Sequence, residues 1–286
     1  MDTKELLKQV RKIEIKTRRL SDHIFSGEYH SSFKGRGMSF AEVRKYQFGD
    51  DVRAIDWMVT ARLNEPYIKT FEEERELTMV LMVDVSGSEF FGSQKRKREV
   101  ITEICATLAF SAIQNNDKVG ILFFSDRIEK FIPPKKGKQH TLHIIRDLIE
   151  LKPEGKGTNI GLAFEYLAGI MKKKAIVFVL SDFVSPTYEK PLKVISRRHD
   201  VTGIRVFDSL EEDIPNLGLV LANDTETGES NWINTSSKKV RKAYNGIHLK
   251  AKDDFQNHFA KSGAGRFSVN TKESYVKKLL TYFQQR

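Results

Sequence analysis

The chain lacks most of the features that mark secreted, membrane-spanning or disulfide-stabilised proteins. Its 286 residues include one cysteine, so no disulfide can form within the chain. Cys105 falls in an apolar helical pattern and is predicted to be a small core residue. The longest apolar runs, near Val80 and at 175–180, are far shorter than the roughly 20 residues of a membrane-spanning helix. Residues 1–20 contain no continuous apolar segment, so we expect no signal peptide and a cytoplasmic protein.

Positive charge is in excess, but it is not concentrated in one segment. Lys and Arg number 48 against 38 Asp and Glu, a net charge of +10, which suggests a nucleic acid or an acidic surface as partner. No zinc-finger spacing, glycine-aromatic RNA motif or basic-zipper pattern accompanies these residues. We therefore expect no dedicated nucleic-acid binding and favour an acidic protein surface. The basic clusters lie at 95–98, 135–138, 172–174 and 238–242.

The first part of the chain is predicted to form an accessory module, residues 1–77. Apolar side chains recur at spacings of three and four over residues 3–24, which predicts an amphipathic helix that packs on its own domain. Residues 25–77 are less regular and carry dense charge of both signs, with a short helix expected within 51–62 and a strand within 66–71. Solvated loops and a salt-bridged contact surface both explain this composition, and the two interpretations stay open.

From Thr78 onward, buried strands alternate with amphipathic helices. This alternation predicts an α/β domain over residues 78–286 with a doubly wound, mostly parallel sheet flanked by helices. A β-hairpin is expected as an insertion near 217–235, and a long helix is expected to end at Gly263. Strands are predicted at 78–84, 119–124, 129–132, 175–180, 201–207 and 266–269, with Pro133 and Pro134 ending the third.

Oxygen-bearing side chains occur at three places where a strand ends or a helix begins: Asp84, Ser86 and Ser88 in one turn, Thr158 in a glycine-rich loop, and Asp182 after a strand. If the strands that begin at 78 and 175 are neighbours, these side chains meet at the switch point of the sheet. Oxygen ligands without nitrogen or sulfur suit Mg²⁺ or Ca²⁺, and a site with few ligands favours Mg²⁺. Two carboxylates leave such an ion with positive charge that a carboxylate from another molecule would satisfy.

The pattern Asp-x-Ser-x-Ser at 84–88, with Thr158 and Asp182, resembles the metal-ion-dependent adhesion site of von Willebrand factor A domains. The resemblance implies that Ser86, Ser88 and Thr158 ligate the metal directly, while the two carboxylates act largely through water. It implies Mg²⁺, with Ca²⁺ or Mn²⁺ as alternatives.

A second resemblance covers nearly the whole chain. The segments 35–44, 49–57, 71–75, 121–126, 198–201 and 225–229 resemble the bacterial family catalogued as domain of unknown function 58. This resemblance implies a von Willebrand A-like protein that works beside a MoxR-type AAA+ ATPase, as an adaptor or chaperone component in the assembly or maturation of protein complexes. One departure from many A domains is Phe183, which stands where glycine is common and is expected to alter access to the metal.

Two other interpretations compete with a metal-dependent adaptor. Asp84 and the serines could simply cap the helix that follows, since Asp and Ser favour that position. A Mg²⁺-dependent phosphohydrolase could use a strand-terminal Asp as nucleophile. Position 86 is serine, however, so no second carboxylate stands two residues on as general acid. Ser125 has no evident base, and His140, His143 and His199 show no metal spacing, so we expect a non-enzyme.

Overall fold

The computed structural model describes residues 39–72, 77–87, 97–212, 214–223 and 230–285. Contacts divide the chain into two compact units, one of which spans Phe33–Leu77. The other contains Thr78–Arg286. The smaller unit therefore ends where the predicted accessory module ends. The helix expected at 3–24 lies outside the described residues, and the assignment of 1–77 as a single module stays a prediction.

The smaller unit is built on an antiparallel pair of strands, β1 (Ser39–Lys45) and β2 (Tyr67–Glu72). A 3-10 turn at Val52–Ala54 and helix α3 (Trp57–Leu63) connect them. Asp56 caps α3, because its carboxylate accepts hydrogen bonds from the backbone of Met58 and Val59. The sequence did not predict β1. A register shift between Phe40 and Glu42 breaks the alternation of apolar and polar side chains that would have marked it.

The larger unit contains a six-stranded sheet in the order β10-β7-β6-β3-β4-β5. All neighbouring pairs are parallel except β4 and β5. The strand order reverses direction at β3, which has β4 on one side and β6 on the other. This arrangement confirms the predicted doubly wound α/β fold. The strands are β3 (Thr78–Asp84), β4 (Lys118–Phe124), β5 (Ile128–Lys135), β6 (Ile176–Ser181), β7 (Asp200–Phe207) and β10 (Gly265–Asn270).

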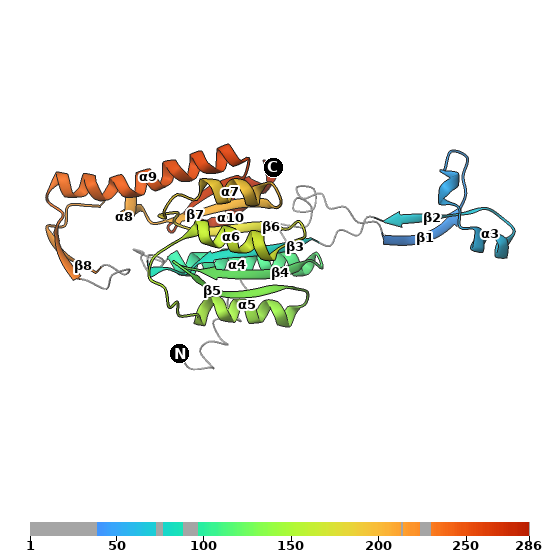
Figure 1. The fold of residues 1–286 in the computed structure, drawn as a ribbon, viewed down its shortest axis with the longest axis horizontal. Helices are drawn as coiled ribbons and strands as arrows, with labels where there is room; N and C mark the ends of the chain where they lie inside the picture. Colours follow the sequence, from blue (N-terminus) through green and yellow to red (C-terminus); the bar gives the residue numbers. More distant parts are fainter. Residues whose placement is uncertain (1–38, 73–76, 88–96, 213, 224–229, 286) are drawn as a thin grey trace. The chain divides into compact units, whose positions relative to one another are not determined.

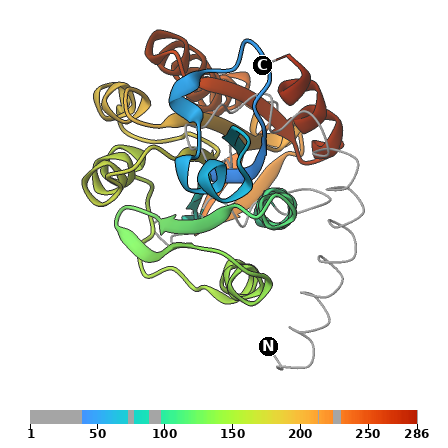
Figure 2. The same cartoon turned by 90° about the vertical axis from the view of Figure 1, so that its right-hand side faces the viewer.

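Helices cover both faces of this sheet (Figures 1 and 2). Helices α6, α7 and α9 contact one another along one face, and α4 contacts α5 on the other. A hydroxyl contact of 3.5 Å between Thr107 and Tyr275 joins α4 to α10. The helices are α4 (Lys97–Gln114), α5 (Lys138–Glu150), α6 (Ile160–Ile170), α7 (Glu189–Ser196), α8 (Ser209–Glu212), α9 (Lys238–Ser262) and α10 (Tyr275–Gln284).

The central strands are covered on both sides. Every residue of β6 is buried, and so is every residue of β3 after Thr78. Such continuous apolar runs are typical of parallel strands with helices on both faces. Cys105 is fully buried in α4, as the sequence predicts. None of the helices in the described ranges is both long and apolar enough to cross a membrane, and the cytoplasmic location stays a prediction.

The prediction that Pro133 and Pro134 end a strand is wrong. Strand β5 continues through both prolines to Lys135, antiparallel to β4 and at the outer edge of the sheet. Proline lacks an amide hydrogen and is tolerated in a sheet only at such an edge or at a bulge. The partner strand accommodates Pro134 with a glycine, because a Cβ atom at Gly120 would lie 2.8 Å from the proline ring.

The predicted hairpin insertion is present between β7 and α9. It consists of β8 (Leu219–Asn223) and β9 (Ser230–Asn234), which pair antiparallel as a separate two-stranded sheet. Helix α9 follows and ends at Gly263, whose φ of 69° is the left-handed conformation that glycine favours at helix ends. The hairpin precedes the first turn of α9 in the chain and extends away from that end of the helix (Figure 1).

Candidate metal centre

The candidate site begins at the end of β3, where Asp84 meets the neighbouring strand β6. Oxygen Oδ2 of Asp84 accepts a hydrogen bond of 2.6 Å from the hydroxyl of Ser181. Oδ1 accepts one of 2.9 Å from the backbone of Ser86. The sequence missed Ser181, which fixes the first carboxylate on the adjacent strand. The two strands are neighbours, as the sequence argument requires, and their carboxyl ends form the switch point of the sheet.

Hydrogen bonds bring the three predicted loops together at this edge. The backbone amide of Gly87 donates to the carbonyl of Lys156 over 3.3 Å, which joins the first loop to the second. The hydroxyl of Ser185 lies 3.4 Å from the carbonyl of Thr158 and accepts a hydrogen bond from the backbone of Ile160. Ser185 therefore joins the second loop to the third. The adjacency of the loops rests on these contacts as well as on the strand order.

The hydroxyl of Thr158 has an environment that suits a ligand. Its Oγ1 is buried and has no hydrogen-bond partner among the described residues. A buried hydroxyl without a partner costs free energy, so such atoms point to a missing ion or water. The loop that carries it is fixed by Glu129, whose carboxylate accepts hydrogen bonds from the backbone of Glu154 and Gly155. Glu129 also accepts a hydrogen bond of 2.6 Å from Ser125, so this serine does have a carboxylate neighbour.

Asp182 is held by a buried ammonium group that the sequence argument missed. Nζ of Lys97 donates to Oδ2 of Asp182 and to Oε1 of Glu211, each over 2.7 Å. All three side chains are buried. The sequence analysis counted Lys97 among the basic clusters, yet it lies three and four residues before Val100 and Ile101, on the apolar face of α4. This spacing could have predicted that Lys97 is buried. Its second partner, Glu211, lies on helix α8, which the sequence did not predict.

Phe183 lies in the core, and its effect on access to the metal stays a prediction. Its side chain is buried in the core, with ring centroids 4.4 Å from Phe255 and 5.4 Å from Phe259. The backbone adopts a φ of 62°, a left-handed conformation that glycine tolerates and an aromatic residue adopts at a cost. Its amide donates to the hydroxyl of Ser181, which helps to hold this conformation. The ring anchors the third loop to α9.

The remaining sequence candidates lie as follows. Ser86 is fully buried beside Asp84, and Ser88 lies outside the described residues. His140, His143 and His199 contact, respectively, the carbonyl of Val119, the carboxylate of Asp147 and the amide of Ala175. Within the described ranges, no group of three or more His, Cys, Asp or Glu side chains is placed to hold a metal. The candidate centre differs from such groups because it combines two carboxylates with hydroxyls.

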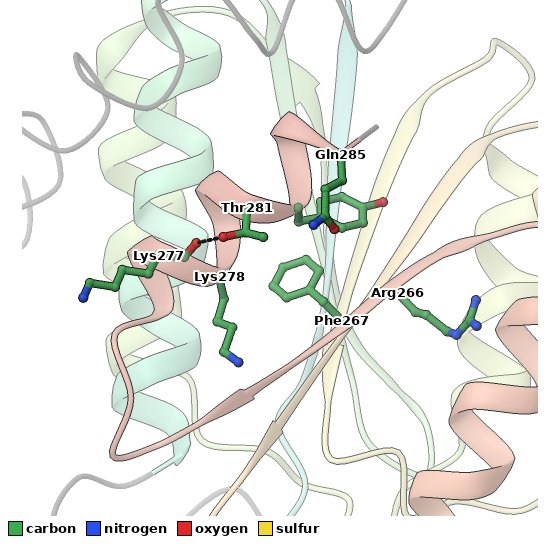
Figure 3. A pocket seen from close by; sticks show the side chains of 7 residues that line it. Arg266, Phe267, Lys277, Lys278, Thr281 and Gln285 are labelled. Atoms are coloured by element: carbon green, nitrogen blue, oxygen red, sulfur yellow. Dashed lines mark hydrogen bonds between the residues drawn. The ribbon is translucent and has the colours of Figure 1, made fainter.

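A separate depression lies between β10 and α10 (Figure 3) and shares no residue with the candidate centre. Arg266, Lys277 and Lys278 contribute positive charge to its lining. The rings of Phe267 and Tyr282 pack together there with centroids 4.8 Å apart. The guanidinium of Arg266 is already bonded to the side chain of Gln256 at 2.8 Å. We assign no function to this depression.

Comparison with known proteins places the chain in a family. The model of the family described as "Protein of unknown function DUF58" matches residues 42–254. The chain belongs to this family. A DUF58 relative, the uncharacterized protein Rv1480 of Mycobacterium tuberculosis (strain ATCC 25618 / H37Rv), is 29% identical over 232 residues, 80% of this chain and 73% of that protein. The uncharacterized protein YeaD of Bacillus subtilis (strain 168) is 29% identical over 121 residues, 42% of this chain and 27% of that protein. The predicted family is thereby confirmed.

Among solved structures, this DUF58 chain is similar to the conserved hypothetical protein BatB from Bacteroides thetaiotaomicron. The identity is 16%, the TM-score is 0.49, and the match covers 73% of this chain and 98% of that chain. It is also similar to the SpRpn10 VWA domain, with 12% identity, a TM-score of 0.40 and coverage of 72% and 94%. The assignment of the fold rests on the strand order described above and not on these similarities.

The first prediction concerns the buried ion pair. Lys97→Met leaves two buried carboxylates without their ammonium, and we expect a loss of about 3–5 kcal/mol in the free energy of unfolding. Lys130→Met is the matched control, because Lys130 and Asp147 also lie 2.7 Å apart but the lysine side chain is 43% exposed. That change should cost at most about 1 kcal/mol. Urea unfolding measures both, and similar losses for the two variants would contradict a structural role for Lys97.

The second prediction concerns Asp84 in the metal-free protein. Burial, and secondarily the charge of Asp182, raises the pKa of Asp84 from 3.8 to about 6. Between these values the folded chain binds more protons than the unfolded chain, so Asp84 makes stability fall as the pH rises across this window. With EDTA present, the decrease between pH 4 and pH 6 should be smaller in Asp84→Asn than in the unmodified protein. Urea unfolding at both pH values tests this, and identical decreases would exclude the ionisation of Asp84 as a cause.

Proposed function

We propose that this protein is a non-enzymatic, metal-dependent adaptor that binds an acidic residue of a partner protein. The observation that carries the proposal is the buried Thr158 hydroxyl, which has no partner among the described residues and lies on a loop joined by hydrogen bonds to the loops of Asp84 and Asp182. Helix capping alone does not explain three loops that converge in this way. The donor set of hydroxyls and carboxylates suits a hard cation such as Mg²⁺.

The hydroxyls of Ser86, Ser88 and Thr158 would hold the ion directly in this proposal. The two carboxylates already accept hydrogen bonds at each oxygen, Asp84 from Ser86 and Ser181, and Asp182 from Lys97 and Val184. Each carboxylate oxygen can accept a further hydrogen bond, so water molecules can connect these groups to the ion. A bound Mg²⁺ would supply a Lewis-acidic position that accepts an oxygen ligand from outside the chain.

The proposed ion keeps a coordination position for an anionic ligand. Asp182 and Glu211 share the ammonium of Lys97, so these three groups and Asp84 together carry two negative charges, equal to the charge of a divalent cation. In the proposal the neutral hydroxyls hold the ion and the carboxylates act through water, so a carboxylate of a partner can coordinate the ion directly. The resemblance to proteins that work beside MoxR-type AAA+ ATPases suggests such an ATPase as the partner, in the assembly or maturation of protein complexes.

The third prediction tests the metal with two threonines whose hydroxyl oxygens are buried. Thr158→Val keeps the shape of the side chain and removes the proposed ligand, so the increase in Tm on adding MgCl₂ should disappear. Thr141→Val is the matched control, because its hydroxyl oxygen is likewise buried without a partner among the described residues, but it lies on α5. At one hundred times the Kd, Mg²⁺ should add about 2.7 kcal/mol of stability to the control. An unchanged Mg²⁺ effect in Thr158→Val would refute the metal site.

The fourth prediction tests the partner. The MoxR-type ATPase from the same organism, purified and immobilised, should bind the unmodified protein and Thr141→Val at constant MgCl₂ and ATP. Thr158→Val and Asp84→Ala should bind at least about tenfold more weakly, the equivalent of 1.4 kcal/mol. Constant MgCl₂ avoids the loss of nucleotide from the ATPase that EDTA would cause. Equal binding by all four proteins would exclude docking through this site.

A phosphohydrolase is the alternative outcome of the same experiments. In that case the protein would release phosphate from p-nitrophenyl phosphate with MgCl₂, and Asp84→Asn would abolish the release. That result would replace the adaptor proposal.

A further inference from the structure

A second interaction surface lies on the hairpin between β7 and α9. Leu221 is directly opposite Trp232 in the register of the two strands, so both side chains lie on the same face. Leu219 is two residues from Leu221 and lies on that face as well. These three large apolar side chains are 53%, 66% and 62% exposed for Leu221, Trp232 and Leu219 respectively. The face is therefore apolar and open to solvent.

The opposite face of the hairpin is also apolar. Val220 and Ile233 are opposite each other in the register and are half-buried. The base of the hairpin is fixed by Thr235, whose hydroxyl donates to the carbonyl of Gly218 over 2.7 Å and accepts from the amide of Leu217 over 2.9 Å. A strand pair that is apolar on both faces is typical of a sheet covered on both sides. Here the described residues leave the outward face exposed, and exposed apolar patches of this kind mark interaction sites.

Positive charge follows the hairpin directly in the chain. The segment from Ser230 to Lys252 contains no Asp or Glu, and it contains Lys238, Lys239, Arg241, Lys242, Lys250 and Lys252. Lys238, Lys239 and Lys242 are exposed in the first turns of α9, directly after the hairpin. Leu249 is also exposed, two helical turns beyond Lys242 and on the same side of the helix. The guanidinium of Arg241 bonds to the carbonyls of Thr235 and Ser236, which fixes the helix against the base of the hairpin.

We propose that the outward face of β8 and β9, together with the first turns of α9, binds a polypeptide segment that carries both acidic and large apolar side chains. The apolar side chains of the segment would cover Leu219, Leu221 and Trp232. Its carboxylates would face the lysines of α9, so charge complementarity identifies the class of partner. This surface does not include the candidate metal centre, and its function does not depend on a metal.

Two other anionic partners, a lipid surface and a single-stranded nucleic acid, are outcomes that the experiment below separates from an acidic polypeptide. A single-stranded nucleic acid needs aromatic side chains on which its bases stack, and the exposed face offers one aromatic ring and two leucines.

The experiment uses three labelled peptides of sixteen residues and fluorescence anisotropy. We expect an amphipathic peptide of Glu and Leu to bind more tightly than a peptide of Glu and Ser or one of Lys and Leu. Trp232→Ser should weaken binding of the Glu/Leu peptide by at least about thirtyfold, as expected for loss of an aromatic anchor at an interface. The triple change Lys238→Gln, Lys239→Gln, Lys242→Gln should weaken it and reduce its dependence on salt.

The matched control is the triple change Lys172→Gln, Lys173→Gln, Lys174→Gln, which removes three exposed lysines from another part of the chain and should leave binding unchanged. Binding should also persist in Thr158→Val and with EDTA, which separates this surface from the metal site. Equal affinity for all three peptides would refute the proposal. Tighter binding of phosphatidylglycerol vesicles or of a twenty-nucleotide DNA strand would refute it too. So would a dimer that dissociates in Trp232→Ser, because a second copy would then be the occupant.

Discussion

The parallel pairing of β3 with β6 is the constraint on which the candidate site depends. It places Asp84 beside Ser181, and the 2.6 Å hydrogen bond between them connects the ends of two strands that are 97 residues apart in sequence. The chain leaves β3 toward β4 on one side and later reaches β6 on the other, so the two carboxyl ends form the switch point of the sheet. The loops carrying Thr158 and Asp182 then meet there through backbone and hydroxyl contacts of 3.1 to 3.4 Å.

A buried lysine lowers the free-energy cost of burying the carboxylates near this site. Asp84, Asp182 and Glu211 are all buried, and three carboxylates without a counter-charge would shift their pKa values or unfold the site. The ammonium of Lys97 pairs with Asp182 and Glu211, so the uncompensated negative charge is mainly that of Asp84, whose pKa rises to about 6. A cation at the proposed centre would compensate that charge. The protein thus supplies one positive charge itself and leaves the place for another.

Sequence patterns predicted the sheet, its helices and the hairpin, because continuous apolar runs and helical periodicity depend only on neighbouring residues. The meeting of Asp84 and Asp182 depended on the condition that their two strands are neighbours, and the pairing of β3 with β6 meets that condition. The patterns failed where a contact joins residues far apart in the sequence, and where a bulge interrupts the alternation of side chains along a strand. Glu211 lies on a four-residue helix with no periodicity, and its relation to Lys97 appears only in the fold. Strand β1 was missed because its register shifts. Strand β5 was predicted too short because its two prolines were read as the end of the strand, whereas they mark its position at the edge of the sheet.

Those prolines also limit how the sheet can grow. Strand β5 is an outer strand, and an outer strand ordinarily presents a row of amide hydrogens to which a strand from another molecule can add. Positions 133 and 134 supply no amide hydrogen at all, and they form a bulge, two residues against Gly120 of β4, that increases the local twist. Templated strand addition, the first step of many protein aggregates, is therefore blocked along this part of the edge. Strand β10, the other outer strand of this sheet, contains no proline, so this protection belongs to the β5 edge alone.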